Sequence, residues 1–550
     1  MYSSLHNHSY FSFLDGICSP KEMLEQAKNV GLHSLAITDH GNVFSYVYFD
    51  EVKKDYPDIK VLYGVEFYEC DDMAVKDENN KYYHLIAIAK NEDGRKALNH
   101  LVTEGNFDGF YYKPRIDLKA MKPYGENLIV SSACLASKLA RESDFDKCIR
   151  YVNEYKSVFP HYYLEMQSHD VPLQKEYNIK VLKLAKATNT PFIITTDSHA
   201  ATQEQLKYQK YHVAIARDAE TIGETYKDCY IQSEDEIHSI MDNQIGYDNV
   251  CIALENTNEI ADMCDEISMP YSKPKLPKFP LPEGFDTDYD YLVYLCNEGW
   301  NTRNISTLSD KEISEHKKRL AHELSVIKQM GFEGYFLIVW EFIHWAKENS
   351  ISIGAGRGSG AGSLVNYLLG ISQLDPLKFG LIFERFLNPE RINMPDIDTD
   401  VSDRGRIIEH MKQLYGEDKV CQVANFSMIT NIVAIKDIGR ILQIPYTVCD
   451  KVSKRFTSDN WDECVKNCSD ILENHPEYNE WFDIAQHEVG RPRQLGIHAG
   501  GVIVADGDLD NYDALCRGSK GERVLQMDKH YCESIGLIKL DILGLPTLDI

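Results

Sequence analysis

The chain has 550 residues, of which 43% are hydrophobic and 26% charged, and its formal net charge is −27. This length exceeds what one hydrophobic core supports and predicts about two to four domains. The acidic balance argues against a protein that coats nucleic acid by bulk attraction, but it leaves room for a local basic channel or an acidic metal site.

Membrane and secretion signals are not found in the sequence. It has no run of about 18 apolar residues, so no membrane-spanning helix is expected. The first residues, MYSSLHNHSYFSFLDG, lack the basic and apolar regions of a signal peptide. Fourteen cysteines are scattered without CxxC pairs, as in reduced cytosolic proteins. We therefore expect a cytoplasmic protein without disulfides.

The first half of the chain alternates short apolar runs with amphipathic stretches. The runs lie at residues 34–38, 61–67, 84–89, 127–132, 162–166 and 191–196. Continuous apolar strands separated by helices are typical of parallel strands covered by helices. This pattern predicts a β/α barrel or a doubly wound sheet.

Polar residues gather near the ends of these apolar runs, with His84 as the exception. The candidates are His6, His8, Asp39, His40, Glu66, His84, Cys134, Asp197 and His199. In a β/α barrel the carboxyl ends of the strands converge on one mouth, where active sites form. Histidine, carboxylate and cysteine together suit Zn²⁺, Mn²⁺ or iron better than Ca²⁺. Any one histidine could instead be a satisfied core or surface residue, but the joint pattern favours a metal site.

These segments carry a family resemblance. LHNHSYFSFLDG, LAITDHGN, GVEFY, GFYYKPRID and TTDSHA resemble the polymerase-and-histidinol-phosphatase (PHP) domain that opens bacterial replicative DNA polymerases. The resemblance implies a distorted (β/α)7 barrel holding several metal ions, and a 3′–5′ exonuclease or related phosphoesterase activity. The ligands that it implies are all present: His6, His8, Asp15, His40, Glu66, His84, Cys134, Asp197 and His199. Glu165 and His169 either line the same mouth or are polar strand ends.

A linker follows at residues 270–284, PYSKPKLPKFPLPEG, which contains five prolines. Proline is excluded from helix interiors and central strands, so this segment is the best candidate for a domain boundary. A helical stretch at 309–331 comes next. Residues 426–499 are expected to be mainly helical, and the last stretch returns to strands.

The glycine-rich segment GAGRGSGAGS, residues 354–363, precedes a predicted helix, LVNYLLGIS. It lacks the lysine and serine or threonine of a P-loop. Exposed backbone N–H groups leading into a helix N-terminus would suit a triphosphate. A flexible turn is the alternative.

The acidic segment NMPDIDTD follows, with Asp396, Asp398 and Asp400 at every second position. Side chains alternate across a strand, so the three carboxylates would share one face. Such a face is either a solvent-exposed acidic edge or a cation-binding site.

The whole region from 354 to 400, with LGIHAGGVIV and GLIKLDILGL later, closely resembles the palm of the family C polymerases, the bacterial DNA polymerase III alpha subunits. The resemblance implies a polymerase-β-like nucleotidyltransferase palm in which Asp396, Asp398 and Asp541 hold Mg²⁺ ions. Asp400 is not part of that triad, and we expect it not to be a ligand.

Residues facing the incoming dNTP are proposed from the same motifs. They are Gly356, Arg357, Gly358, Ser359 and Lys539. Arg385 and Arg391 either neutralise phosphate or form salt bridges at helix ends.

The resemblance divides this α/β multidomain chain along its length. The expected parts are a PHP domain (1–269), the linker (270–284), the palm in two parts (285–425 and 500–550) and an inserted helical thumb (426–499). The family continues past this point with fingers and with modules for duplex and clamp. We therefore expect a separate C-terminal polymerase half, together with primer–template DNA, dNTPs, a sliding clamp and a proofreading exonuclease as partners.

Three functions remain open from the sequence. The first is the N-terminal part of a replicative DNA polymerase alpha subunit. The second is a stand-alone PHP phosphoesterase, and the third is a non-catalytic half that awaits a C-terminal polymerase partner. The complete aspartate triad favours the first over the second, and the complete metal-ligand set counts against the third.

Overall fold

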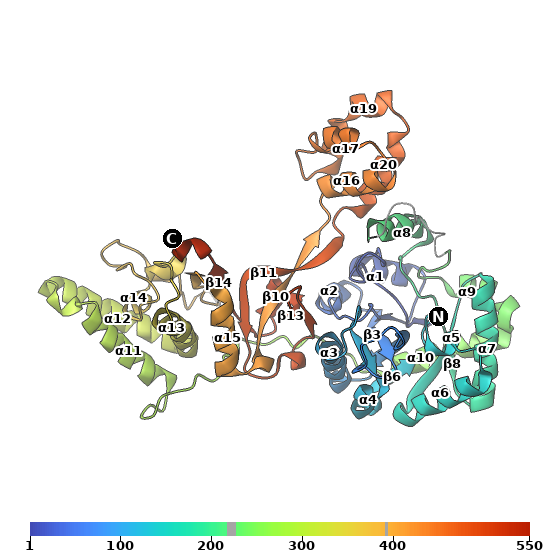
Figure 1. Ribbon diagram of the computed structural model, residues 1–550, viewed down its shortest axis with the longest axis horizontal. Coiled ribbons are helices and arrows are strands. Elements are labelled where there is room, and N and C mark those ends of the chain that lie inside the picture. The colour runs from blue at the N-terminus through green and yellow to red at the C-terminus, as the bar shows by residue number, and fades with distance from the viewer. Residues whose placement is uncertain (217–226, 391–393, 550) are drawn as a thin grey trace. The chain divides into compact units, whose positions relative to one another are not determined.

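The computed structural model describes residues 1–216, 227–390 and 394–549, and the chain forms two compact units (Figure 1). The first unit contains residues 1–269, 426–496 and 513–517. The second contains residues 270–425, 497–512 and 518–550. Among the described residues, no helix has both the length and the apolar character needed to cross a membrane.

The first unit is built on an eight-stranded sheet in the order β1-β2-β3-β4-β6-β7-β8, with β5 paired to β3. Beyond the ends of β1 and β8, Asn7 and Ser198 form a parallel bridge that nearly closes the sheet into a barrel. The strands are β1 (Ser3–Ser4), β2 (Ser34–Ile37), β3 (Lys60–Cys70), β4 (Tyr83–Ala89), β5 (Arg115–Asp117), β6 (Leu128–Ser131), β7 (His161–Gln167) and β8 (Phe192–Thr195).

The expectation of parallel strands is wrong for β4, which runs antiparallel to both β3 and β6. A parallel neighbour needs a crossover connection, usually a helix. Residues 71–82, between β3 and β4, contain no helix, so the chain turns back instead. The other neighbouring pairs are parallel, as expected.

Helices surround this sheet (Figure 1). Ser19 and Ser233 begin two of them with reciprocal capping boxes, in which the serine hydroxyl accepts from the third helical N–H. The helices are α1 (Pro20–Asn29), α2 (Tyr46–Val52), α3 (Glu92–Phe107), α4 (Leu118–Met121), α5 (Lys138–Arg141), α6 (Phe145–Val158), α7 (Pro172–Thr188), α8 (Gln203–Ala216), α9 (Glu234–Ile245) and α10 (Tyr247–Met263).

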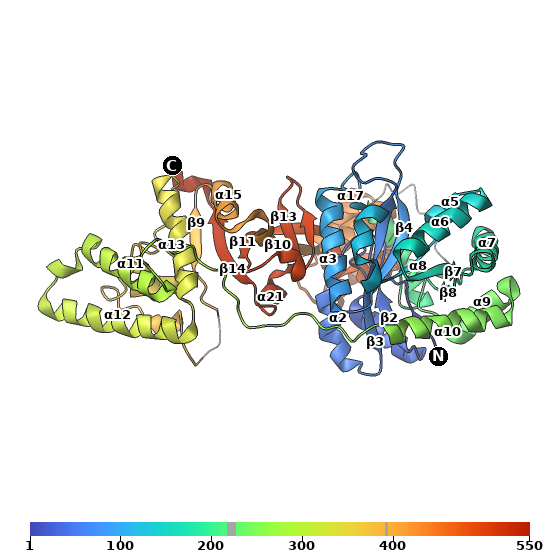
Figure 2. The same ribbon diagram turned by 90° about the horizontal axis from the view of Figure 1, so that it is seen from below.

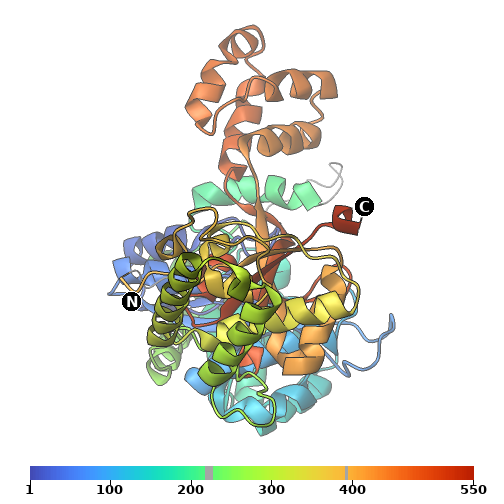
Figure 3. The ribbon, with the colours of Figure 1, turned by 90° about the vertical axis from the view of Figure 1, so that its left-hand side faces the viewer.

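A further group of helices belongs to the same unit and is seen again in Figure 3. It comprises α16 (Asn431–Ile441), α17 (Tyr446–Ser453), α18 (Trp461–Lys466), α19 (Ser469–Asn474) and α20 (Tyr478–Glu488). Its core includes Ile438 and Trp481, continuous with Leu206 of α8. On α8, His212 lies 2.6 Å from Glu488, and both side chains are fully buried. Residues 426–499 were predicted to be mainly helical. The prediction is correct for residues 431–488, but both ends of the range belong to strands, β10 and β11.

The second unit is organised around a sheet whose strands lie in the order β13-β10-β11-β14-β9. The strands are β9 (Asp398–Val401), β10 (Val420–Met428), β11 (Pro492–Val504), β13 (Arg523–Asp528) and β14 (Ile538–Gly544). The ends of β10 and β11 at 426–428 and 492–496, and the whole of β12 (Leu515–Arg517), are counted in the first unit. β14 pairs in parallel with β9 and antiparallel with β11. The segment 429–491 therefore lies between two neighbouring strands, β10 and β11.

The helices of this unit include the predicted stretch at 309–331, which is α12, capped by Ser309. They are α11 (Asp288–Thr302), α12 (Asp310–Met330), α13 (Glu333–Glu348), α14 (Leu364–Leu368), α15 (Arg404–Tyr415) and α21 (Lys529–Cys532). Figures 1 and 2 show α11 and α12 side by side. Leu337, Val365 and Ile542 belong to one buried core, so helices and sheet form a single packed body.

Candidate functional site

The first candidate centre lies at one end of the barrel-like sheet. His6 and His8 follow β1, His40 follows β2, Glu66 is in β3 and His84 opens β4. Cys134 follows β6, while Asp197 and His199 follow β8. Different strands therefore deliver these side chains to one place. The structure brings together all nine residues that the family resemblance implied, with Asp15 supplied by the loop after His8. Asp39, which the sequence pattern also selected, instead accepts hydrogen bonds from the hydroxyls of Ser9, Ser12 and Ser45.

Glu66 is at the centre of the group. Its Oε1 lies 2.9 Å from His84 Nδ1 and 3.3 Å from His6 Nε2. Its Oε2 lies 2.5 Å from His40 Nδ1 and 3.7 Å from His8 Nε2. Only 1% of the glutamate is exposed. One buried carboxylate thus faces four imidazoles.

The remaining candidates complete the ring around these imidazoles. Asp197 Oδ1 is 3.2 Å from the Nε2 atoms of both His6 and His8. Asp15 Oδ2 is 3.1 Å from His40 Nε2 and 3.6 Å from His199 Nε2. The Cys134 thiol lies 3.4 Å from His84 Nδ1.

Ligand atoms in this centre are spaced as shared metal ligands require. Three sets of three each have atoms within 4.8 Å of one another: His8, His40 and His199; His6, His8 and Glu66; His40, Glu66 and His84. His40 Nδ1 and Glu66 Oε2 are both buried and lie 2.5 Å from each other. Buried ligand atoms gathered so closely fit a metal ion, and the imidazole, carboxylate and thiol set fits Zn²⁺, Mn²⁺ or iron.

Charge explains why the cluster fits a cation. Burial lowers the pKa of His40, but the carboxylates of Glu66 and Asp15 outweigh it and raise that pKa to about 9. Burial, with the repulsion of His40 and His199, lowers the pKa of His8 to about 3. Burial raises the pKa of Glu66, yet the facing His84 and His40 hold it well below its ordinary value. The buried carboxylates are therefore stabilised by nearby positive charge. Protonated histidines supply that charge here, and a bound divalent cation would supply it equally.

Glu165 holds one ligand from behind. Its Oε1 lies 2.7 Å from His6 Nδ1, so the Nε2 of His6 is directed into the cluster. The same carboxylate accepts hydrogen bonds from Ser131 and Thr195. His169 lies beside it in sequence but instead contacts the Thr196 carbonyl oxygen at 2.8 Å. Glu165 is thus a positioning residue at this mouth.

The second candidate centre belongs to the other unit. Asp541 in β14 is the direct neighbour of Asp398 in β9, and Asp396 lies two residues before Asp398. One carboxylate oxygen from each aspartate lies within 4.8 Å of the others. Asp396 lies just before β9, but its side chain is on the same face of the sheet as those of Asp398 and Asp541.

The electrostatics of the three aspartates also fit cations. Burial, then the charge of Asp541, then that of Asp398 raise the pKa of Asp396 to about 6. Lys539 Nζ lies 2.8 Å from Asp541 Oδ2 and partly offsets the repulsion. An all-carboxylate set with hard oxygen donors fits Mg²⁺. The sequence pattern selected Asp396 and Asp398, and the family resemblance added Asp541.

The glycine-rich segment approaches the aspartates at Gly358. This residue has φ of +67°, and a Cβ atom there would lie 2.9 Å from Asp398 Oδ2. Arg357 next to it lies 3.3 Å from Asp398 Oδ1 through Nη2 and 3.3 Å from Asp400 Oδ1 through Nε. Asp400 thus contacts an arginine and is outside the three-aspartate group. Gly356 packs against Ser372, and Ser359 begins a short 3-10 turn. Arg391 lies outside the described residues.

The expectation of free N–H groups at the following helix is wrong. α14 has five residues, and Glu323 occupies its N-terminus. The Glu323 carboxylate accepts hydrogen bonds from the N–H groups of Leu364 (2.9 Å) and Val365 (3.0 Å) and from the Ser363 hydroxyl (2.8 Å). The protein's own carboxylate therefore fills the anion position that the pattern assigned to a triphosphate.

Two family models match separate parts of the chain. The model for the PHP domain matches residues 4–169, and that for the bacterial DNA polymerase III alpha NTPase domain matches residues 290–544. DNA polymerase III subunit alpha from Borreliella burgdorferi is 37% identical over 99% of this chain. The Escherichia coli subunit is 34% identical over 99%, and that of Thermus aquaticus 32% over 100%. The chain belongs to the bacterial DNA polymerase III alpha family.

The chain spans about half the length of the DNA polymerase III alpha subunits that it matches: 48% of the Borreliella burgdorferi and Escherichia coli subunits and 51% of the Thermus aquaticus subunit. The predicted resemblance is thereby confirmed for both the PHP and the polymerase parts. The expected α/β architecture is confirmed at the same level, as two matched domains in a mixed α/β structure.

Some residues around these centres were not selected from the sequence. Glu323 had no local signal, because its partners lie about forty positions away and only the fold brings them together. Arg404 was missed for the same reason. Its guanidinium donates to the backbone oxygens of Ile542 (2.8 Å) and Gly501 (3.1 Å), and so ties β14 to β11 beside Asp541.

Proposed function

We propose that the chain provides the nucleotidyl-transfer centre of a replicative DNA-directed DNA polymerase, which joins dNTPs to a primer 3′-hydroxyl. The observation that carries this proposal is the meeting of Asp396, Asp398 and Asp541 on one sheet face. Family membership supports it, since the relatives are named as DNA polymerase III alpha subunits. In this proposal the second unit is a polymerase-β-like palm.

The three aspartates would hold two Mg²⁺ ions, which in such sites activate the attacking hydroxyl and neutralise the transferred phosphates. Asp398 and Asp541 are fixed by strand pairing, so their separation does not depend on loop conformation. Lys539 and Arg357 lie on either side of them and would attract the triphosphate. Gly356, Gly358 and Ser359 would let the loop backbone approach it.

Cation binding to the Asp541→Asn variant tests this assignment. The substitution keeps the shape of the side chain but removes one charge from the group of three. We expect loss of Mn²⁺ or Mg²⁺ binding in a calorimetric titration at the second unit, with unchanged circular dichroism. The matched control is Asp418→Asn, which removes an exposed acid of the same unit. Equal cation binding by both variants would contradict the proposal.

A second activity is proposed for the PHP domain: metal-dependent hydrolysis of phosphodiesters, including the 3′ end of a DNA strand. The observation that favours it is the complete set of nine ligand residues, with Glu66 at the centre of the other eight. His6, His8, Glu66 and Asp197 would hold ions that supply Lewis acidity to a phosphodiester. Glu165 would keep His6 in the ligating orientation.

Elemental analysis tests this second site without reference to activity. His6→Ala with His8→Ala should remove Zn, Mn or Fe from protein purified without chelator. His33→Ala with His238→Ala is the control, because both histidines lie in the same unit outside the cluster. Unchanged metal content in the first variant would contradict the assignment.

The proposed partners follow from the two activities. Primer–template DNA and dNTPs would serve the palm, and the helices between residues 431 and 488 would act as a thumb that contacts duplex backbone. A sliding clamp, a proofreading exonuclease and a C-terminal polymerase half are proposed from the family. A cytoplasmic location is proposed on the same basis.

A further inference from the structure

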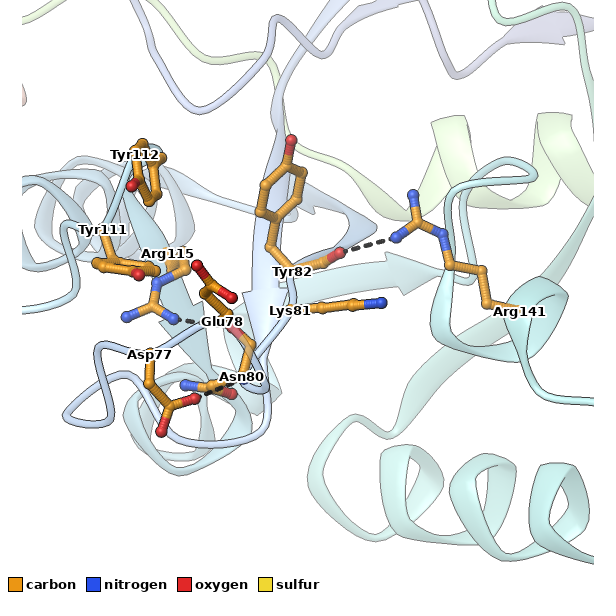
Figure 4. A pocket seen from close by; sticks show the side chains of 9 residues that line it. All are labelled: Asp77, Glu78, Asn80, Lys81, Tyr82, Tyr111, Tyr112, Arg115 and Arg141. Carbon is orange, nitrogen blue, oxygen red and sulfur yellow. Dashed lines mark hydrogen bonds between the residues drawn. The ribbon is translucent and has the colours of Figure 1, made fainter.

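A separate pocket of about 360 Å³ lies beside the first metal centre (Figure 4). Its walls come from the segment 77–82, which leads into β4, from the segment 111–115, and from Arg141 at the end of α5. None of these residues belongs to the nine candidate ligands. The metal centre therefore does not account for the pocket.

A buried arginine gives the pocket a fixed shape. Arg115 is fully buried, and its guanidinium donates to the backbone oxygens of Gly109 (3.1 Å), Asn80 (3.1 Å) and Val75 (3.0 Å). These bonds join the loop before β4 to the loop before β5. Because the two walls are tied together from beneath, the pocket is preformed, as ligand sites usually are.

Tyrosines provide the walls with aromatic surfaces. Tyr112 is 81% exposed and has φ of +59°, a conformation that is costly for a bulky residue and is often found at functional sites. Its ring meets that of Tyr111 edge to face, with centroids 4.7 Å apart. Tyr82 contributes a third ring to the lining. A water-exposed tyrosine held in this way is available to stack on a flat ligand.

Ring contacts connect the pocket to the metal centre. The Tyr82 ring is parallel to that of the candidate ligand His84, at 11° with centroids 6.4 Å apart. It also meets Tyr68 edge to face at 5.2 Å, and Tyr68 in turn stacks on His40. One side chain thus separates the pocket from the ligands, so a single extended molecule could occupy both.

The charged groups of the lining are of both signs. Lys81 and Arg141 are exposed cations, while Asp77 and Glu78 are exposed acids. Asp77 already accepts from the N–H groups of Asn79 and Asn80. Mixed donors and acceptors around aromatic faces suit the polar edge of a nucleobase better than a row of phosphates.

We propose that this pocket binds an unpaired nucleobase of a single-stranded nucleic acid whose phosphodiester lies in the adjacent metal centre. Stacking on Tyr112 and Tyr82 would hold the base without selecting its sequence, because every base has an aromatic face. Lys81 and Arg141 would attract the connecting backbone. The inference rests on the proposed phosphodiester hydrolysis and names single strands as the substrate class of that site.

Steady-state hydrolysis separates the pocket from the metal centre. Tyr112→Ala should raise KM for a single-stranded oligothymidylate about tenfold, in keeping with the loss of one stacked base. The same variant should leave hydrolysis of the small diester bis(4-nitrophenyl) phosphate unchanged. Tyr247→Ala is the matched control, since Tyr247 is 62% exposed in the same unit. An unchanged KM for the oligonucleotide would overturn the proposal.

Photo-crosslinking tests the pocket even if the protein hydrolyses neither substrate. An oligothymidylate carrying 5-iodouracil near its 3′ end, and phosphorothioates at the terminal linkages, is irradiated with the full chain. Mass spectrometry should locate the cross-link in peptides containing Tyr82, Tyr111 or Tyr112, and Tyr112→Ala should reduce it about tenfold. Cross-links confined to other segments would overturn the proposal, because the pocket would then not bind the oligonucleotide. Failure of hydrolysis alone would contradict only the proposed activity.

Discussion

Glu66 shows how one buried carboxylate organises a metal centre. Its two oxygens face His6, His8, His40 and His84 at distances from 2.5 to 3.7 Å. An ion pair in such a place is tolerated only while every charge has a partner, because removing one side leaves the other buried and uncompensated.

Glu66→Gln is expected to remove that partner while keeping the side-chain size. In protein stripped of metal, we expect the first unit to lose about 3–5 kcal/mol of unfolding free energy, the usual cost of breaking a buried ion pair. Metal content should fall as well. Urea unfolding and elemental analysis measure the two effects. A variant with unchanged stability and metal content would show that Glu66 is not the centre of the cluster.

Glu69, three residues after Glu66 in β3, gives a pH prediction. Burial raises the pKa of its carboxyl from 4.5 to about 7, although the Tyr155 hydroxyl donates to it. The folded state therefore binds a proton that the unfolded state releases, and stability falls as the pH rises from about 4.5 to 7. The loss amounts to about 3 kcal/mol for such a shift.

Glu69→Gln should remove this contribution, since the amide does not ionise. Urea unfolding of the first unit at pH 5 and pH 8 makes the comparison. We expect the wild-type protein to lose more stability than the variant between these two pH values. Equal losses in both proteins would mean that Glu69 is not protonated in the folded state.

At the scale of elements, α14 depends on a residue from α12. Glu323 is fully buried and accepts from the first two N–H groups of α14, and Arg319 Nε donates to it at 2.6 Å. Arg319 also donates to the Gly362 backbone oxygen at 2.7 Å. These bonds fix the end of the glycine-rich segment, whose middle residue Gly358 approaches Asp398.

Glu323→Ala should release this end of the segment. Each unpaired buried donor costs about 1–3 kcal/mol, and the amides of Leu364 and Val365 should exchange with solvent faster. Hydrogen exchange followed by mass spectrometry measures this. The control is Glu315→Ala, which removes an exposed glutamate from the same helix. Unchanged exchange at α14 would contradict the capping role.

Elements differ in how far the sequence specifies them. Six strands of the first unit (β2, β3, β4, β6, β7 and β8) were predictable because they are continuous apolar runs, and most of the ligands because they lie near the ends of those runs, whereas the short strands β1 and β5 carry no such signal. The direction of β4 was not, since it depends on whether residues 71–82 form a crossover helix. Glu323 looked like any helical glutamate, because its burial arises from a fold that brings residues 323 and 364 together.

At the scale of the whole chain, the helices from 431 to 488 are an insertion between two paired strands. β10 and β11 are neighbours in the second sheet. At the base of the insertion, the Ile429 N–H donates to the Arg491 oxygen and the Gly490 N–H to the Ile429 oxygen, both at 2.8 Å. The two strands are thus held together at the base of the insertion, and we expect them to pair even without the inserted helices.

Replacing residues 431–488 with a short turn tests this independence. The strands on both sides remain paired, so we expect the variant to keep cation binding at Asp396, Asp398 and Asp541. It should be less stable in the first unit, where α8 loses its apolar partner. Calorimetry with Mn²⁺ and thermal unfolding measure the two. Lost cation binding in a folded variant would show that the insertion shapes the aspartate site.

The central claim is that this chain carries two separate metal centres, one of imidazoles around Glu66 and one of three aspartates. Anomalous diffraction from crystals grown with Mn²⁺ tests it most directly, because the ion is located independently of activity. The account predicts peaks among His6, His8, His40 and Glu66, and a further peak among Asp396, Asp398 and Asp541. Absence of density between the three aspartates at saturating Mn²⁺ would contradict it.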